Sequence, residues 1–345
     1  MRLPGTLGTY VTALLTGGLV LACSSDTTDP NDPDNPDALG LAVAVRTDPS
    51  TFQQTGDFVL ELIPSTRQGQ SLVSEQWNIS STLTAPAGAP PVFVSQQVQP
   101  PDTTPSNVAL LVDNSQSMLQ NDPDRLRVTA AQLLWDTLLG QQHNEEVSLL
   151  YFGFGPLTPT SGFTATRLLR SWTSDPSALT GILDTLQLGT SSRIYSSALD
   201  VVEWFDTTTS ADHRRVLLLL TDGLLNREGG ATVSEVLAAA QRAHVNIGTV
   251  GLGPASDRGP TTQPEAVTLL QELANGTGGL YAGAATPERL SSTLLSLTAW
   301  SSTGVLLANF KLSPIPPTGT HISGNVELQN DSRGKAQGVW SFVAP

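Results

Sequence analysis

Apolar residues follow two different spacings along the chain, and the change of spacing divides it into three parts. From residue 39 to 104, apolar side chains alternate with polar ones in short runs such as Phe58–Ile63. Alternation with period two, interrupted by turn residues, predicts β-strands. From residue 105 to 302, continuous apolar runs such as Val216–Leu220 are separated by stretches with helical spacing. These continuous runs predict strands that are buried on both faces.

The helical stretches carry start signals, each with a capping residue followed by proline or glutamate. They are Asp122-Pro123, Asp175-Pro176, Thr232 with Glu235, and Thr286-Pro287. Proline suits the first turn of a helix, and threonine with glutamate three residues later has the spacing of a capping box. Strands that alternate with such helices predict an α/β fold, in which a doubly wound, mostly parallel sheet has helices on both faces.

The alternating pattern returns from residue 303 to 345, where three apolar runs predict three strands. Three strands are too few for a separate sandwich. We therefore expect this C-terminal β segment to pair with the N-terminal β segment, residues 39–104, in a flanking all-β, sandwich-like domain. The α/β domain, residues 105–302, is then inserted between the two segments.

The first residues of the chain differ from the rest in composition. Residues 1–22 begin with Arg2 and continue in an apolar run, which is typical of a secretory signal and is too short for a stable membrane span. The segment from Leu19 to Cys23 resembles a bacterial lipobox, where the leader is cut before the cysteine and the cysteine is acylated. We interpret residues 1–22 as a lipoprotein signal peptide and Cys23 as the lipidated residue. The alternative is an ordinary signal peptide with a chance cysteine.

Residues 23–38 are expected to be a disordered tether that links a lipid anchor to the folded body. After the cysteine the segment is acidic and rich in proline, and it has no large apolar side chain with which to form a core. Ser24 follows the cysteine, which resembles the outer-membrane address of enterobacterial lipoproteins. The resemblance implies a protein that is lipid-anchored in the bacterial cell envelope, at the outer membrane.

Charge and cysteine content narrow the possible functions. The net charge of −14 argues against a nucleic-acid partner, which would need a basic patch. Cys23 is the only cysteine, so the expected mature chain has no disulfide framework and depends on burial for its stability.

Oxygen-bearing side chains gather where the first predicted strand of the α/β part ends. The apolar run Asn107–Val112 is followed by Asp113, Ser115 and Ser117, which stand at alternate positions. Three oxygen donors that leave a strand into a loop suit Mg²⁺, Mn²⁺ or Ca²⁺ better than Zn²⁺, which prefers nitrogen and sulfur.

Two later segments can complete this set of ligands. Asp222 follows the predicted strand Val216–Leu220, and Gly223 lets the chain turn sharply there. A hydroxyl-rich loop between the Asp113–Ser117 motif and Asp222 offers Thr190 and Ser192, either of which can coordinate a cation. Because ligands in open α/β sheets lie beyond the carboxyl ends of the strands, two carboxylates and three hydroxyls are expected around one cation.

This arrangement resembles the metal-ion-dependent adhesion site of a von Willebrand factor type A domain, over about residues 105–302. That site combines Asp-x-Ser-x-Ser with a distant threonine and a distant aspartate, and the matching residues here are Asp113, Ser115, Ser117, Thr190 or Ser192, and Asp222. The resemblance implies a Mg²⁺ ion, or Mn²⁺ or Ca²⁺, with an open coordination position. A protein ligand would fill that position with a glutamate or aspartate carboxylate.

The sequence lacks the usual marks of an enzyme. It has no His-Glu-x-x-His, no Gly-x-Ser-x-Gly and no phosphate loop, and no general base accompanies the oxygen cluster. We therefore expect a non-enzymatic, surface-anchored binding protein. Three alternatives stay open: an envelope assembly or scaffold protein in which the domain is a structural interaction module, a metal that only holds its loops, and a metal-dependent hydrolase.

Overall fold

The computed structural model describes most of the chain. The described residues are 39–140, 145–154, 158–179, 181–182, 189, 192–223, 230–298 and 303–345. The expected signal peptide and tether, with Cys23, lie outside the described residues, and so does Thr190. No helix within the described stretches is long and apolar enough to cross a membrane.

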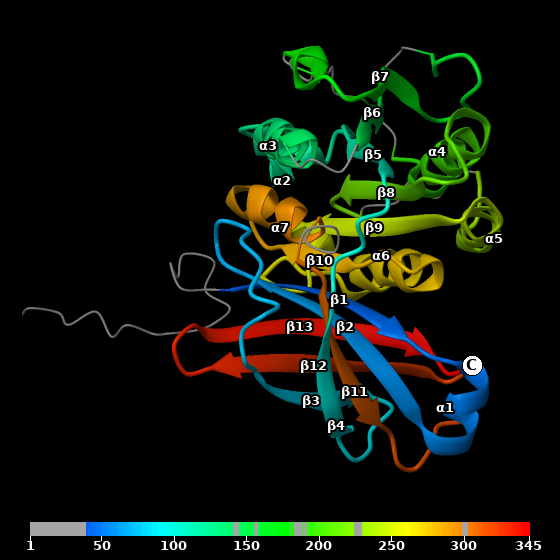
Figure 1. Cartoon of the computed structure of the whole chain (residues 1–345). Coiled ribbons are helices and arrows are strands. Elements are labelled where there is room, and N and C mark those ends of the chain that lie inside the picture. Colours follow the sequence, from blue (N-terminus) through cyan, green and yellow to red (C-terminus); the bar gives the residue numbers. More distant parts are fainter. Residues whose placement is uncertain are drawn as a thin grey trace, which may run out of the picture.

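These residues form two sheets, the larger of which has ten strands in the order β4-β11-β2-β1-β10-β9-β8-β5-β6-β7 (Figure 1). Half of this sheet is parallel, as the α/β prediction requires. Its parallel strands are β5 (Ser106–Asp113), β6 (Glu146–Phe152), β8 (Arg214–Thr221), β9 (Val245–Leu252) and β10 (Tyr281–Ala284). The edge strand β7 (Arg167–Thr173) joins β6 antiparallel, and the sequence pattern does not predict it.

Helices cover both faces of the parallel strands, so these strands serve two cores. Every residue of β5 is buried; Val108 and Leu110 belong to one core, while Ala109 and Leu111 belong to the other. The first core is covered by α3 (Leu126–Gly140) and α7 (Leu290–Ser296). The second is covered by α4 (Ile194–Thr208), α5 (Val233–Ala243) and α6 (Pro264–Thr277) (Figure 1). The doubly wound α/β prediction is confirmed.

The predicted helix starts agree with the structure to different degrees. Thr232 and Glu235 form the predicted capping box of α5. The other signals lead first into short helical turns: α2 (Met118–Asn121) before α3, η1 (Pro176–Leu179) after Asp175, and η4 (Pro287–Arg289) before α7. A helix that begins at Pro123 is a wrong prediction, because the chain turns at Arg125, with φ of 56°, and α3 begins at Leu126.

Asp122 nevertheless caps α3 from a distance. Its carboxylate accepts hydrogen bonds from the backbone N–H groups of Leu126, at 2.7 Å, and Arg127, at 3.2 Å. These are N–H groups of the first turn, which have no partner within the helix. The capping residue was therefore identified correctly, and the length of the turn after it was not.

Four strands from the two flanking β segments extend the large sheet antiparallel beyond β10. They are β1 (Gly40–Arg46), β2 (Asp57–Ser65), β11 (Val305–Lys311) and β4 (Val92–Gln99). The second sheet contains β3 (Asn78–Ala85), β12 (His321–Asn330) and β13 (Gly334–Val343). Because β1 pairs with β10, one layer of this sandwich-like part is continuous with the α/β sheet.

Aromatic side chains fill the space between the second sheet and the extension of the first. Phe58 lies 5.2 Å from Trp340 and 5.5 Å from Phe342, measured between ring centroids, and it stacks on Phe310. The Trp340 indole N–H donates to the Ser81 hydroxyl at 2.9 Å. Strands from both ends of the sequence therefore share one core, next to α1 (Pro49–Thr55), whose Phe52 is buried beside Phe342.

Candidate metal site

The ends of two neighbouring strands create the candidate site. β5 and β8 are adjacent and parallel, so their carboxyl ends meet at the same edge of the sheet. Asp113 is the last residue of β5, and Asp222 follows β8; both side chains are fully buried. The hydroxyl of Thr221 donates to Asp113 Oδ2 at 2.6 Å and so ties the two strand ends together.

The loop after β5 folds its three oxygen-bearing side chains toward one another. The backbone N–H of Ser115 donates to Asp113 Oδ1 at 2.8 Å. This hydrogen bond, from the backbone two residues further on to the aspartate side chain, forms an Asx-turn. The hydroxyls of Ser115 and Ser117 lie 3.0 Å apart. The structure thus brings together the three predicted residues of the first motif.

The middle part of the predicted site approaches the same loop. Gly189 forms a β-bridge with Ser115, and its N–H donates to the carbonyl of Asn114 at 3.0 Å. Ser192 is buried, and its hydroxyl has no hydrogen-bond partner among the described residues. A buried hydroxyl without a partner is costly, so this residue fits a ligand that supplies a partner when it binds.

Burial and like charge perturb the first carboxylate. Burial, and after it the negative charge of Asp222, raise the pKa of Asp113 to about 6, although hydrogen bonds from Ser115 and Thr221 oppose the rise. Two carboxylates that repel each other in a buried site are a favourable environment for a cation. The donor set, with carboxylates and hydroxyls only, fits a hard ion such as Mg²⁺.

A zinc-type cluster does not occur in the part of the chain that the structure describes. There, no group of three or more His, Cys, Asp or Glu side chains is placed to hold a metal ion. The candidate site differs from such a cluster because hydroxyl groups make up much of it.

Two residues that the sequence analysis missed support this site. The side-chain amide of Asn121, in α2, donates to Asp222 Oδ2 at 2.9 Å. Arg127 is buried; it forms an ion pair with Asp122 at 2.6 Å and donates to the side-chain oxygen of Asn114 at 3.1 Å. The only sign of these Arg127 contacts in the sequence was the position of the arginine, three residues before Ala130 and so on the buried face of α3.

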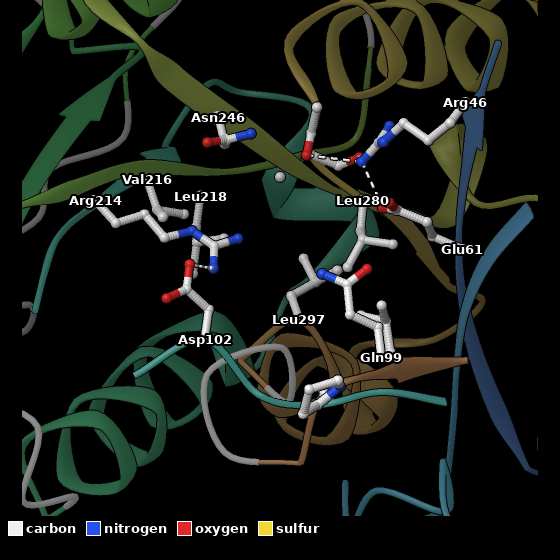
Figure 2. A pocket seen from close by; sticks show the side chains of 16 residues that line it. Arg46, Glu61, Gln99, Asp102, Arg214, Val216, Leu218, Asn246, Leu280 and Leu297 are labelled. Carbon is white, nitrogen blue, oxygen red and sulfur yellow. Dashed lines mark hydrogen bonds and ion pairs between the residues drawn. The ribbon is translucent and has the colours of Figure 1, made fainter. Parts of the chain in front are cut away.

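A cavity of about 440 Å³ lies at the opposite, amino-terminal ends of β8 and β9 (Figure 2). Its walls carry two ion pairs, Arg46 with Glu61 at 2.6 Å and Arg214 with Asp102 at 3.1 Å. Arg46 also donates to the carbonyl of Gly278 at 2.8 Å and to the carbonyl of Gly279 at 3.3 Å. Arg46 therefore links β1 to the turn before β10. The cavity is separate from the candidate metal site, because the two lie at opposite ends of the parallel strands.

The comparisons with known proteins concern the same part of the chain. The sequence profile of the von Willebrand factor type A domain matches residues 108–224, which contain every predicted ligand of the candidate site. The pattern of this domain class is therefore present in the chain. No curated protein matched the sequence.

Several solved structures are similar to the chain, all at low identity. The conserved hypothetical protein BatB from Bacteroides thetaiotaomicron is 20% identical, with a TM-score of 0.40, over 57% of this chain and 100% of that one. The vWF domain of the type V pili tip protein Mfa5 from Porphyromonas gingivalis is 12% identical, with a TM-score of 0.41, over 56% and 93%. The pilus adhesin SpaC from Lactobacillus rhamnosus GG is 12% identical, with a TM-score of 0.42, over 91% and 48%.

Proposed function

We propose that this chain binds a protein partner through a divalent cation, without catalysing a reaction. Asp113, Ser115, Ser117 and Asp222 would hold the cation together with Ser192 or Thr190. The observation that carries the proposal is the combination of a buried, unpartnered Ser192 hydroxyl with two buried carboxylates that repel each other at one sheet edge. Each of these is costly without a cation and favourable with one.

The cation would supply positive charge and a coordination position for the partner. Serine and threonine hydroxyls are neutral ligands, so they leave much of the ion's charge uncompensated. A glutamate or aspartate side chain of the partner is the natural last ligand for Mg²⁺, which prefers oxygen donors in an octahedral arrangement. Mn²⁺ or Ca²⁺ can take the same set of ligands, and calorimetry decides among the three.

The proposed place of action is the bacterial cell envelope. Cys23 would carry the lipid anchor, and the acidic residues 23–38 would hold the folded body away from the outer membrane. Metabolic labelling with a fatty acid, followed by fractionation, tests this part separately. Cys23→Ser should abolish the label and release the protein from the membrane fraction; a label that persists in this variant would refute the anchor.

Calorimetric titration of the full chain with Mg²⁺, Mn²⁺ and Ca²⁺ tests the metal site. Asp113→Ala should abolish binding, whereas Asp212→Ala should leave it unchanged, because Asp212 is exposed and precedes β8, at the opposite end of this strand from Asp222. Ser192→Ala and Thr190→Ala, compared with each other, identify the third-motif ligand. Unchanged metal binding by Asp113→Ala would refute the site.

Partner capture with and without a chelator separates adhesion from scaffolding. If the domain is a metal-dependent adhesion module, the chelator should release the captured protein, and Asp113→Ala should fail to capture it. A partner that is an envelope protein and stays bound in the chelator would instead support the alternative, an assembly or scaffold protein in which the domain is a structural interaction module.

A further inference from the structure

β4 forms one outer edge of the ten-stranded sheet. Within the described residues only β11 pairs with it, so one side of its backbone has N–H and C=O groups that no neighbouring strand uses. All of its residues are exposed. They include large apolar side chains with the exposed fractions Val92 61%, Phe93 38%, Val94 60% and Val98 49%.

This edge lacks the charges that usually protect an exposed strand. From Gln76 to Pro101 the sequence contains no Asp, Glu, Lys or Arg, although the chain as a whole has a net charge of −14. Edge strands in natural proteins commonly carry lysine or another charge that opposes pairing with a second strand. The acidic surface elsewhere repels a second copy of the chain, and this segment adds nothing to that repulsion.

The pairing with β11 determines which side chains of β4 share a face. Phe93 pairs with Phe310 and Ser95 pairs with Asn309, so Val94 is an extra, bulged residue. Beyond the bulge, Gln96 pairs with Ala308 and Val98 pairs with Leu306. Because side chains alternate along a strand, Phe93, Gln96 and Val98 lie on the face of Phe310, toward the second sheet.

These positions are self-complementary in an antiparallel pair. With a two-fold axis at Gln96, this residue lies opposite its own copy, and Ser95 lies opposite Gln97. The bulged residue Val94 does not count in this register, so Phe93 and Val98 each stand two positions from the axis. Phe93 therefore lies opposite Val98 of the other copy, at both ends of the pair and on the same face. Aromatic and β-branched residues in opposite positions are favourable cross-strand partners.

We infer that β4 is an interaction surface for a second copy of this chain, through antiparallel β4–β4 pairing about a two-fold axis at Gln96. Such a contact is isologous and closes after two copies, so it produces a dimer and not a fibre. The prolines on either side, Pro91 and Pro100, limit the pairing to this short strand. A contact of this size predicts weak association, with a dissociation constant on the order of micromolar.

A charge introduced at the axis tests the inference directly. Sedimentation equilibrium of the full chain should show a reversible dimer. Gln96→Lys and Gln96→Glu, each alone, place like charges opposite each other and should weaken dimerisation about tenfold. A mixture of the two variants should recover dimerisation as a heterodimer, because opposite charges then face each other.

Gln54→Lys and Gln54→Glu are the matched controls, since Gln54 is an exposed glutamine on α1, outside β4. Neither should change the dimerisation constant. A wild-type chain that stays monomeric across the micromolar range would overturn the inference, and would leave an extended peptide of another protein as the remaining occupant of the edge. A dimer that Gln96→Lys does not weaken, or that the mixture does not recover, overturns it as well.

Discussion

Asp113→Asn should stabilise the metal-free protein at neutral pH while it removes the proposed metal site. Asp113 is fully buried beside Asp222, so its charged form loses hydration and meets a second negative charge. Asparagine has nearly the same shape and still accepts the hydrogen bond from the Ser115 N–H. The substitution therefore removes the charge and keeps most of the local structure.

The size of the effect follows from the pKa of this group. Its pKa rises from 3.8 in an unperturbed aspartate to about 6 in the folded protein. A rise of this size corresponds to about 3 kcal/mol, since each pH unit is worth 1.36 kcal/mol. The folded state holds the proton more tightly than the unfolded chain, so the free energy of unfolding falls as pH rises between these two values and then stays at the lower level.

Part of this gain is lost at Thr221. Its hydroxyl donates to Asp113 Oδ2, and it must reorient when an amide N–H₂ takes the place of that oxygen. A disturbed hydrogen bond costs about 1 kcal/mol, which leaves a net stabilisation of about 2 kcal/mol for Asp113→Asn at a pH above the folded pKa. At a pH below 3.8 the aspartate is protonated in both states, so the advantage should disappear.

Urea unfolding in a chelator, at mildly alkaline and at acidic pH, measures this difference. Asp212→Asn is the control, because Asp212 is exposed and should show no pH-dependent change. Added Mg²⁺ should reverse the order of stability, since an ion that binds only the folded wild type stabilises it by mass action. Equal stability of wild type and Asp113→Asn at alkaline pH, or an advantage that grows on acidification, would refute the reasoning.

Three further substitutions have expected outcomes that thermal or urea unfolding can check. Arg127→Met should destabilise the fold by about 3–5 kcal/mol, because it leaves Asp122 buried without its ion-pair partner, and the double variant with Asp122→Asn should recover part of the loss. Gly153→Ala should destabilise the fold and weaken Mg²⁺ binding, because φ is +70° there and a Cβ would collide with the backbone of Ser115. Thr232→Ala should cost about 1 kcal/mol through loss of the α5 cap, with metal binding unchanged.

The sequence was sufficient to predict the α/β fold and the positions of Asp113 and Asp222 at strand ends. Both aspartates follow long apolar runs, and parallel strands in one sheet bring their carboxyl ends to the same edge. The motif around Ser115 is equally local, since its contacts join residues two positions apart. Local spacing and one general rule of sheet topology therefore predicted this half of the candidate site.

Asn121 and Arg127 escaped prediction because their contacts depend on tertiary geometry. Asn121 reaches Asp222 from a four-residue helix, across about a hundred positions of sequence. The turn at Arg125, which sets the start of α3, has a positive φ. Arginine is not one of the residue types that commonly adopt a positive φ, so the sequence does not predict this turn. Sequence spacing contains no information on such a distant amide or such an unusual turn.

Helix starts marked by proline were also less informative than the capping box. Proline fixes φ near −65°, which suits a 3₁₀ turn as well as an α-helix. The signals at Pro176 and Pro287 accordingly lead into 3₁₀ helices. The capping box of Thr232 and Glu235 satisfies two specific N–H groups of an α-helix, so it identified the start of α5 correctly.

The proposed metal site and the proposed dimer edge should act independently. Six strands lie between β4 and β5 in the sheet, so seven inter-strand spacings of about 4.8 Å place the two regions roughly 35 Å apart. Substitutions this far apart, without shared partners, usually have additive effects. Asp113→Ala should therefore abolish Mg²⁺ binding and leave the dimerisation constant unchanged, while Gln96→Lys should do the reverse. A single substitution that alters both quantities would show that the extended sheet couples its two ends, and the two proposals would then have to be treated as one mechanism.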